Sequence, residues 1–311
     1  MCTIEEVLEE PVFSEDTVLE YGLEIASKRK KKSKNPNRIF HSIYGSLPLV
    51  LSDQFEDLQT SQHSKVRLDK ADNSRRGLQF FLMAHHWLWA KPKNALVMAT
   101  MFGVAEKYCQ GEHLWRWVRK IAALQEEKIV WEDRTDEELA IEKETFTISV
   151  DGTDFAIWEP KHPTLPIDKS YASHKFKNAG LRYEIAVSVK TGRCVWIHGP
   201  HKAGVHDMTI FRSELKGKIQ PGEAVIADRG YQTSRADEAF MSTPNMHDSQ
   251  AVAKFKSRVR CRQESFNGRL KKYSSMESIW KNTQEKHGWA LRAVAVTVQY
   301  HLEHGQGLFE V

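Results

Sequence analysis

Two aspartates directly follow apolar, strand-like segments in this sequence of 311 residues. Asp151 comes after the run TISV and Asp228 after AVIA, and each has a glycine within the next two positions. An aspartate just past a buried strand lies at the carboxyl edge of the sheet, where sites in α/β proteins usually form. Glu264 lies further along, on a segment that we expect to be helical. Three carboxylates from two strands and a helix could therefore converge on one point.

Converging carboxylates repel one another and need a counter-charge. Mg²⁺ or Mn²⁺ with oxygen ligands is the usual one, and two such ions activate water and stabilise the leaving oxygen in phosphodiester cleavage. The metal candidates are Asp151, Asp228 and Glu264. An aspartate after a strand is also a common turn former. Asp154 and Asp207 are alternative acids, and Asp207 could equally cap the helix that follows it.

The surroundings of Glu264 are strongly basic, in the stretch VRCRQESFNGRLKK at 259–272. On a helix, Glu264, Asn267, Gly268 and Lys271 share one face, so the acid could meet metal ions while neighbouring cations reach DNA phosphates. Phe266, Leu270 and Tyr273 would pack on the sheet. A surface helix with incidental charges is the alternative. The DNA-binding candidates are Arg116, Arg119, Lys120, Arg258, Arg260, Arg262, Arg269 and Lys271.

The elements that would position these residues occupy the second half of the chain. The segments TFTISV, FAIWEP, LRYEIAVSV, CVWIHGP and EAVIADRG read as strands, because they are rich in β-branched and aromatic residues between turn formers. Residues 206–217, 261–275 and 286–303 read as helices. This order predicts an α/β or α+β layered sheet at 145–311. An acidic connector at 131–144 precedes it.

The first half has a different character. Residues 1–75 are expected to be weakly ordered, with a basic block at 27–34. The five basic residues at 28–32 fit a nuclear localisation signal, although a solvated surface tail fits the block as well. Residues 76–130 have helical periodicity, and a glycine turn before a basic helix is compatible with a DNA-binding helix-turn-helix. An ordinary helical bundle, with Trp115 and Trp117 as packing residues, explains the same pattern.

The bulk composition excludes several classes. The net charge is +4, hydrophobic residues make up 41% and charged residues 28%, as in a globular protein with a real core. No run approaches the roughly 18 apolar residues of a membrane span, and the N-terminus lacks a signal-peptide pattern. The four cysteines form no CxxC pair. Zinc fingers and disulfide scaffolds are therefore not expected, which favours a reducing, intracellular setting.

An ordered set of motifs in the second half resembles the PIF/Harbinger group of transposases. The motifs are VDGT (150–153), SHKF and GLRYEIAVSVKTG (173–192), GPHKAG (199–204), HDMTIFR (206–212), VIADRGY (225–231), RQESFNGRLK (262–271) and the C-terminal AVAVTVQYHLEHGQGLFEV. The chain departs from the family pattern at Gln263 and at Trp280-Lys281-Asn282. The resemblance implies an RNase H-like mixed sheet flanked by helices, of the DDE superfamily type. It also implies that Asp151, Asp228 and Glu264 are the catalytic triad.

We therefore expect a DNA transposase or endonuclease that hydrolyses phosphodiester bonds with two Mg²⁺ or Mn²⁺ ions and then transfers the strand. The expected partners are double-stranded transposon ends and target DNA, with a Myb-like DNA-binding protein implied by the resemblance. A homodimer is compatible with this function, no membrane is involved, and the nucleus is the expected location. The alternatives are a domesticated, non-cleaving DNA-binding regulator and another metal-dependent phosphotransferase on the same fold.

Overall fold

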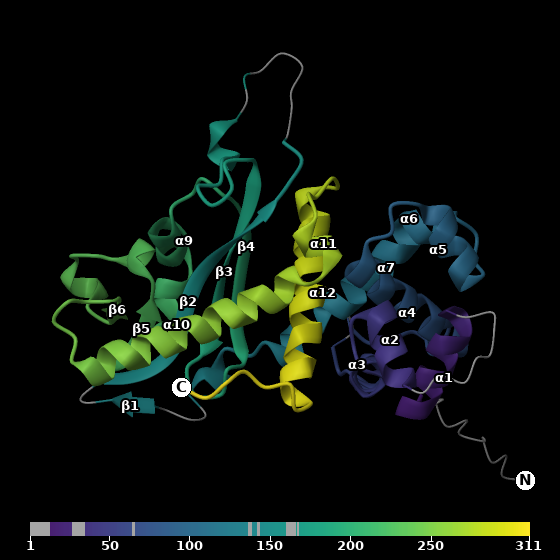
Figure 1. The fold of residues 1–311 in the computed structure, drawn as a ribbon, viewed down its shortest axis with the longest axis horizontal. Helices are drawn as coiled ribbons and strands as arrows, with labels where there is room; N and C mark the ends of the chain where they lie inside the picture. The colour runs from purple at the N-terminus through teal and green to yellow at the C-terminus, as the bar shows by residue number, and fades with distance from the viewer. Residues whose placement is uncertain are drawn as a thin grey trace, which may run out of the picture. The chain divides into compact units, whose positions relative to one another are not determined.

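The computed structural model describes residues 13–26, 35–63, 66–135, 139–141, 144–159, 166 and 168–311. The chain divides into two compact units, Met1–Leu124 and Gln125–Val311, and each is described by itself (Figure 1). The proposed nuclear signal at 28–32 lies outside the described residues. In the described part of the chain, no helix is long and apolar enough to cross a membrane.

The first unit is helical in its described residues. It contains α1 (Glu15–Ala26), α2 (Pro36–Tyr44), α3 (Pro48–Thr60), α4 (Arg75–Ala90), α5 (Ala95–Phe102), α6 (Lys107–Gln110) and α7 (Glu112–Ala123). The expectation of weak order for residues 1–75 is wrong for α1 to α3. Proline stands at the start of α2 and α3, and Gly45 ends α2 at a φ of 71°. The proline and glycine positions favour helices, but the polar composition of residues 1–75 led to the prediction of weak order.

Aromatic side chains from three helices form the core of the first unit. Phe55 of α3 packs edge-on against Phe81 of α4 and stacks on Trp117 of α7. All three are fully buried, and Trp115 of α7 is 2% exposed. Trp115 and Trp117 are therefore packing residues, as the helical-bundle interpretation predicted.

The second unit combines a sheet with helices. The helical elements are α8 (Gln125–Lys128), η1 (Glu132–Arg134), η2 (Lys169–Tyr171), α9 (Asp207–Ser213), η3 (Leu215–Lys218), η4 (Arg229–Tyr231), η5 (Ala236–Glu238), α10 (Gln250–Lys271), α11 (Ser274–Glu277) and α12 (Gln284–Glu303). The strands are β1 (Leu139–Ile141), β2 (Glu144–Ala156), β3 (Gly180–Ser188), β4 (Cys194–Lys202), β5 (Glu223–Ala227) and β6 (Met241–Ser242).

The sheet is mixed, with strand order β4-β3-β2-β5-β6 and β1 paired to β2. Strands β1 to β4 pair antiparallel, whereas β5 runs parallel to β2 and β6 parallel to β5. The connection from β4 to β5 contains α9, as a crossover to a parallel strand requires. This mixed sheet flanked by helices is consistent with the expected RNase H-like fold.

Strand β2 is longer than the sequence pattern predicted. Its pairing with β3 is continuous from Ile148 opposite Ser188 to Ala156 opposite Gly180. The segments TFTISV and FAI are therefore one strand, and Asp151 lies within it. The Asp-Gly-Thr-Asp sequence resembles a turn, but β3 supplies a partner for the whole stretch.

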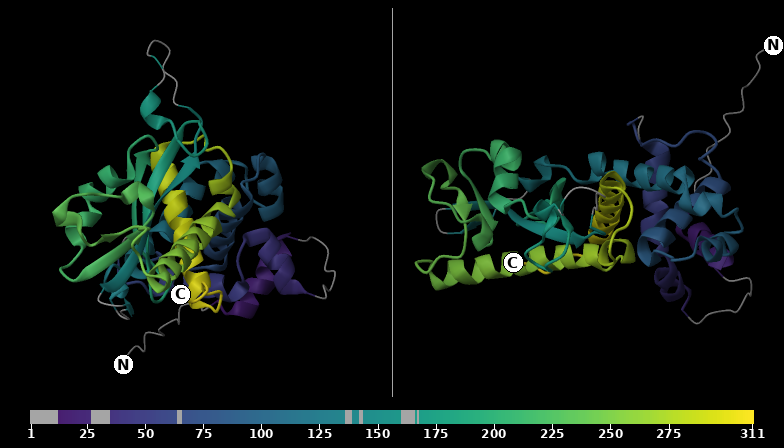
Figure 2. Two further views of the ribbon diagram at one scale, coloured as in Figure 1. Left: turned by 60° about the vertical axis from the view of Figure 1, so that its left-hand side comes forward. Right: turned by 90° about the horizontal axis from the view of Figure 1, so that it is seen from above.

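Helices cover both faces of this sheet (Figure 2). On one face, Met208 and Phe211 of α9 pack with Ile148, Val150 and Ala186. On the other face, Phe255 and Val259 of α10 pack with Phe146, Val189, Ala224 and Ile226. Helix α10 begins at Gln250, well before the predicted start at 261. Its capping residue Ser249 accepts a hydrogen bond from the Val252 amide. Its residues Phe266 and Leu270, and Tyr273 beyond it, are buried as predicted.

Candidate active site

Asp151 and Asp228 occupy equivalent positions on neighbouring parallel strands. The pairing of β2 with β5 ends at Val150 opposite Ala227; Asp151 is the next residue of β2, and Asp228 directly follows the end of β5. Asp228 caps η4 by accepting a hydrogen bond from the Gly230 amide at 2.8 Å. The parallel register therefore brings the two predicted aspartates together at the point where β5 ends.

The electrostatics of Asp151 show that this point is crowded with charge. Burial raises the pKa of Asp151 to about 6, Lys175 opposes the rise, and the negative charges of Asp228 and Asp207 add to it. The Lys175 ammonium donates a hydrogen bond to the Gly152 carbonyl oxygen at 2.5 Å. Three carboxylates thus interact electrostatically, with one lysine beside them.

The third of these carboxylates, Asp207, was considered from the sequence only as an available acid or a helix cap. The cap of α9 is in fact His206, whose Nδ1 accepts a hydrogen bond from the Met208 amide at 3.3 Å. The Asp207 side chain instead lies 3.0 Å from Nη1 of Arg182. Burial raises its pKa, Arg182 and Lys175 lower it, and Asp228 raises it further. Sequence spacing could not reveal this position, because it depends on how α9 packs.

Arg182 links this carboxylate to a second one. Its Nε and Nη2 atoms lie 2.7 Å and 3.0 Å from the two carboxylate oxygens of Asp154. Asp154 also accepts a hydrogen bond from the Ser173 hydroxyl at 2.6 Å. Asp154 is therefore a buried structural partner of Arg182.

Glu264 occupies a different position from the two aspartates. It is exposed on α10, three residues before Asn267. The α10 residue that contacts Asp151 is Asn267, whose Nδ2 donates a hydrogen bond to Asp151 Oδ2 at 2.8 Å. The structure brings Asp151 and Asp228 together, and the metal-binding role of Glu264 stays a prediction.

The two departures from the family pattern have structural roles. Gln263 accepts a hydrogen bond from the Ser149 hydroxyl at 2.7 Å and donates one to the Ile185 carbonyl at 3.3 Å, which fastens α10 to β2 and β3. Trp280 is buried, and its amide donates to the Ala156 carbonyl at 2.9 Å. Both departures therefore support the sheet that carries Asp151.

The predicted DNA-binding residues of α7 contact acidic side chains and a carbonyl of the first unit. Arg116 forms ion pairs with Asp69, at 2.9 Å, and with Asp72. Lys120 donates a hydrogen bond to the Arg67 carbonyl at 3.1 Å and lies 3.8 Å from Asp72. Another ion pair joins Arg119 to Glu112. These contacts give all three cations a role within the helical unit.

The arginines of α10 mostly contact carbonyl groups. Arg258 donates to the Glu310 carbonyl, Arg269 to those of Gln306 and Gly307, and the buried Arg262 to that of Ser188. Lys271 is exposed at the end of the helix and lies over the Phe155 ring, 5.5 Å from its centroid. Arg260 is half-buried. The basic block in the sequence predicted the positions of these cations. It did not predict that Arg258 and Arg269 form hydrogen bonds with backbone carbonyls of the C-terminal segment.

The donor chemistry at Asp151 suits a hard divalent cation, because carboxylate and amide oxygens are its preferred ligands. Among the described residues, no group of three or more His, Cys, Asp and Glu side chains is arranged to hold a metal ion. Asn267 donates a hydrogen bond to Asp151, and Arg182 forms an ion pair with Asp207. The aspartates therefore fit a cation by the chemistry of their oxygen atoms, and Lys175 supplies positive charge near them.

Comparison with protein families matches residues 150–298 to the DDE superfamily endonuclease family. The matched range includes Asp151, Asp207, Asp228 and Glu264. Comparison with curated proteins and with solved structures gave no match. The family match supports a DDE-type transposase family for this part of the chain, and thus a nuclease- or transposase-type function with DNA as its substrate.

Proposed function

We propose that this protein is a metal-dependent DNA endonuclease and transposase of the PIF/Harbinger type. The observation that carries the proposal is the placement of Asp151 and Asp228 directly after the point where the pairing of β2 with the parallel strand β5 ends. A DDE-type family match over the same residues supports it. The subgroup rests on the ordered motifs from VDGT to RQESFNGRLK.

Asp151 and Asp228 would hold the divalent cations, with Glu264 as a further ligand by resemblance. Two bound Mg²⁺ or Mn²⁺ ions would supply activation of water and stabilisation of the leaving oxygen. No nucleophilic side chain is needed, so the protein's contribution is to position the phosphodiester and to stabilise developing charge. After hydrolysis at an element end, the freed 3′-hydroxyl would attack target DNA in a similar step.

The DNA path would pass the carboxyl end of α10. Partial desolvation lowers the pKa of the Lys271 ammonium, Lys175 lowers it further, and the nearby carboxylates of Asp154 and Asp151 oppose this shift. A lysine beside the acids could hold a phosphate next to the reacting bond. Arg260 lies three turns earlier on the same helix and could extend this path.

The remaining features of the proposal concern partners and location. Double-stranded DNA is the substrate, and a Myb-like protein would supply additional sequence recognition. A homodimer would bring two DNA ends together. The basic block at 28–32 would direct the protein to the nucleus.

A cleavage assay tests this function. Linear DNA carrying the element's own ends should be cut in Mn²⁺ or Mg²⁺ and remain intact in chelator, while a binding titration in chelator should show that the DNA is still bound. Binding without cleavage under every metal condition would instead support the non-cleaving regulatory function.

A further inference from the structure

We infer that Asp207 is a metal-binding carboxylate of the same site, acting with Asp151 and Asp228. The inference rests on the proposed function and deepens it, because it assigns a ligand from α9 that neither the catalytic-triad resemblance nor the strand pattern contains. Three observations support it. Two glycines leave space for the Asp207 carboxylate, Arg182 fixes the position of that carboxylate, and the buried amide oxygen of Asn267 has no hydrogen-bond partner in the described structure.

Two glycines leave room for the Asp207 carboxylate. A Cβ atom on Gly152 would lie 2.2 Å from Asp207 Oδ1, and one on Gly230 would lie 3.3 Å from Asp207 Oδ2. Gly152 directly follows Asp151, and Gly230 is the second residue after Asp228. The carboxylate therefore lies between the segments that carry the two predicted ligands, and the glycines of the VDGT and ADRG motifs permit this close approach.

The position of Asp207 is fixed by the protein around it. Its Arg182 partner is 5% exposed at the side chain and already makes two hydrogen bonds to Asp154. Asp154 thus neutralises the charge of Arg182, and the carboxylate of Asp207 is not required for this. Lys175 offsets part of the negative charge of Asp207, Asp151 and Asp228, and a bound cation would offset more of it.

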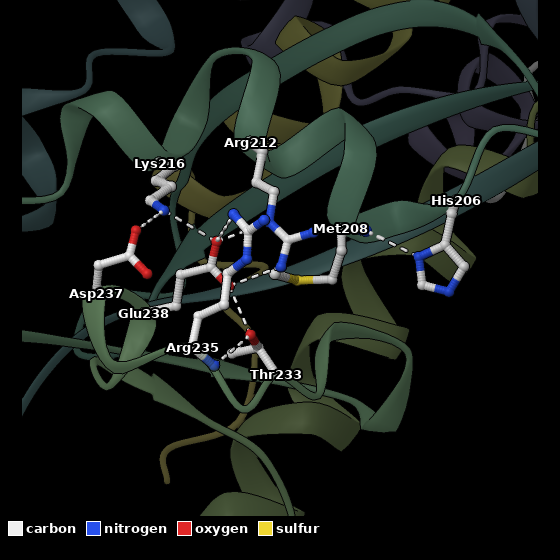
Figure 3. A network of polar contacts seen from close by, with 8 residues as sticks. All are labelled: His206, Met208, Arg212, Lys216, Thr233, Arg235, Asp237 and Glu238. Carbon is white, nitrogen blue, oxygen red and sulfur yellow. Dashed lines mark hydrogen bonds and ion pairs between the residues drawn. The ribbon is translucent and has the colours of Figure 1, made fainter.

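Helix α9, which begins with Asp207, is anchored at its other end by an ion-pair network (Figure 3). The buried Glu238 carboxylate accepts hydrogen bonds from Arg212 Nε at 2.7 Å and from Lys216 Nζ at 2.9 Å. It also accepts one from the Thr233 hydroxyl at 2.6 Å. Through Glu238, these contacts connect α9 and η3 with the segment that follows Asp228. They therefore help to fix the positions of both Asp207 and Asp228.

A buried amide beside the carboxylates points independently to a missing ligand. Asn267 is 6% exposed, and its Nδ2 donates to Asp151, but its Oδ1 is buried without a hydrogen-bond partner in the described structure. Buried polar atoms are rarely left unsatisfied. An amide oxygen next to Asp151 is a suitable ligand for a hard cation, or an acceptor for a water molecule on it.

Metal binding to the full-length protein tests the assignment without relying on activity. Calorimetric titration with Mn²⁺ in the absence of DNA should show that Asp207→Asn weakens binding by about tenfold or more, since even outer partners of metal ligands commonly contribute 10–100-fold. Glu285→Gln is the matched control, because Glu285 is an exposed acid in the first turn of α12. Its affinity should equal that of the wild type.

The outcomes separate this inference from the proposed function. If Asp151→Asn abolishes Mn²⁺ binding while Asp207→Asn leaves it unchanged, Asp207 is only a structural partner of Arg182 and the inference is overturned. If the wild type binds no Mn²⁺, or Asp151→Asn binds it normally, the metal-dependent function itself fails.

A second measurement uses the wild type alone, in case Asp207→Asn does not fold. With added hydrogen peroxide, Fe²⁺ substituted at the site is oxidised to Fe³⁺ while the peroxide is reduced to hydroxide and a hydroxyl radical, and this radical cuts the nearby backbone. The inference predicts cuts near 151, 207 and 228. Cuts near 151 and 228 with none near 207 would contradict it.

Discussion

Asn267 of α10 donates a hydrogen bond to Asp151 of β2 at 2.8 Å, and this contact joins the long helix to the centre of the candidate site. Because the amide fixes one carboxylate oxygen, Asn267→Ala should reduce DNA cleavage by about 10–100-fold, the usual effect of losing a group that orients a metal ligand. It should lower the free energy of unfolding by about 1–3 kcal/mol.

The control for Asn267 is Ser265→Ala, because the Ser265 hydroxyl donates a hydrogen bond to the Cys261 carbonyl of the same helix. Thermal unfolding and single-turnover cleavage separate the two effects. Equal cleavage by both variants would show that Asn267 does not position Asp151.

Lys175 should compete with divalent cations for the same carboxylates, because it opposes the raised pKa of both Asp151 and Asp207. Lys175→Met should therefore tighten Mn²⁺ binding by up to about fivefold, since exposed ion pairs contribute at most about 1 kcal/mol. Lys169→Met, an exposed lysine of η2, is the control for calorimetry. Weaker Mn²⁺ binding in Lys175→Met would mean that the lysine supports the metal.

Glu184 should make stability fall as the pH rises. Burial on β3 raises the pKa of this carboxyl from 4.5 to about 8, against a hydrogen bond from Trp196. Between these two values the folded state holds a proton that the unfolded state has lost, so the free energy of unfolding decreases with increasing pH. Glu184→Gln removes the titration and should raise the melting temperature at pH 9.

At pH 4 both states of the wild type hold the proton, and the advantage of Glu184→Gln should disappear. Denaturant unfolding at the two pH values is the measurement. A variant that is equally stabilised at both would show that the gain comes from packing and not from ionisation.

DNA binding should be strongly salt-dependent, with Lys271 and Arg260 of α10 among the residues that contact phosphates. For six to ten phosphate contacts, affinity should fall by about 10³–10⁵ between 50 and 200 mM salt. Lys271→Gln and Arg260→Gln should each reduce the logarithmic salt slope by about one. Arg116→Gln should change it little, because Arg116 is paired with Asp69 and Asp72. A large change from Arg116 alone would assign the DNA path to α7 instead.

The sequence predicted the parts of this structure that depend on local pattern. The apolar runs before Asp151 and Asp228 predicted two strands with adjacent acids, and the spacing of Phe266 and Leu270 predicted the buried face of α10. Helices α1 to α3 were missed because polar composition outweighed their capping signals. Strand β2 was divided in two because the effect of β3 on a turn-like sequence is a long-range one.

The partners of charged residues could not be predicted for the same reason. Arg262 and Arg269 read as DNA contacts, but in the structure they donate to backbone carbonyls that are distant in sequence. Asp207 read as an available acid or a helix cap, whereas its position follows from the packing of α9 against the sheet. The sequence does contain Gly152 and Gly230, which leave space for the Asp207 carboxylate. This role can be recognised only when the position of Asp207 is known.

Single-turnover cleavage of end-containing DNA in Mn²⁺ tests the central claim most directly, with Asp151→Asn, Asp228→Asn and the double variant compared with the wild type. We predict that each single variant loses cleavage while still binding DNA in chelator. The double variant should be little worse than either single variant, because residues that act as a unit are not additive. Glu264→Gln in the same assay decides whether the exposed acid of α10 joins the site. Cleavage at wild-type rate by Asp151→Asn or Asp228→Asn would contradict the claim that these two aspartates form the active site.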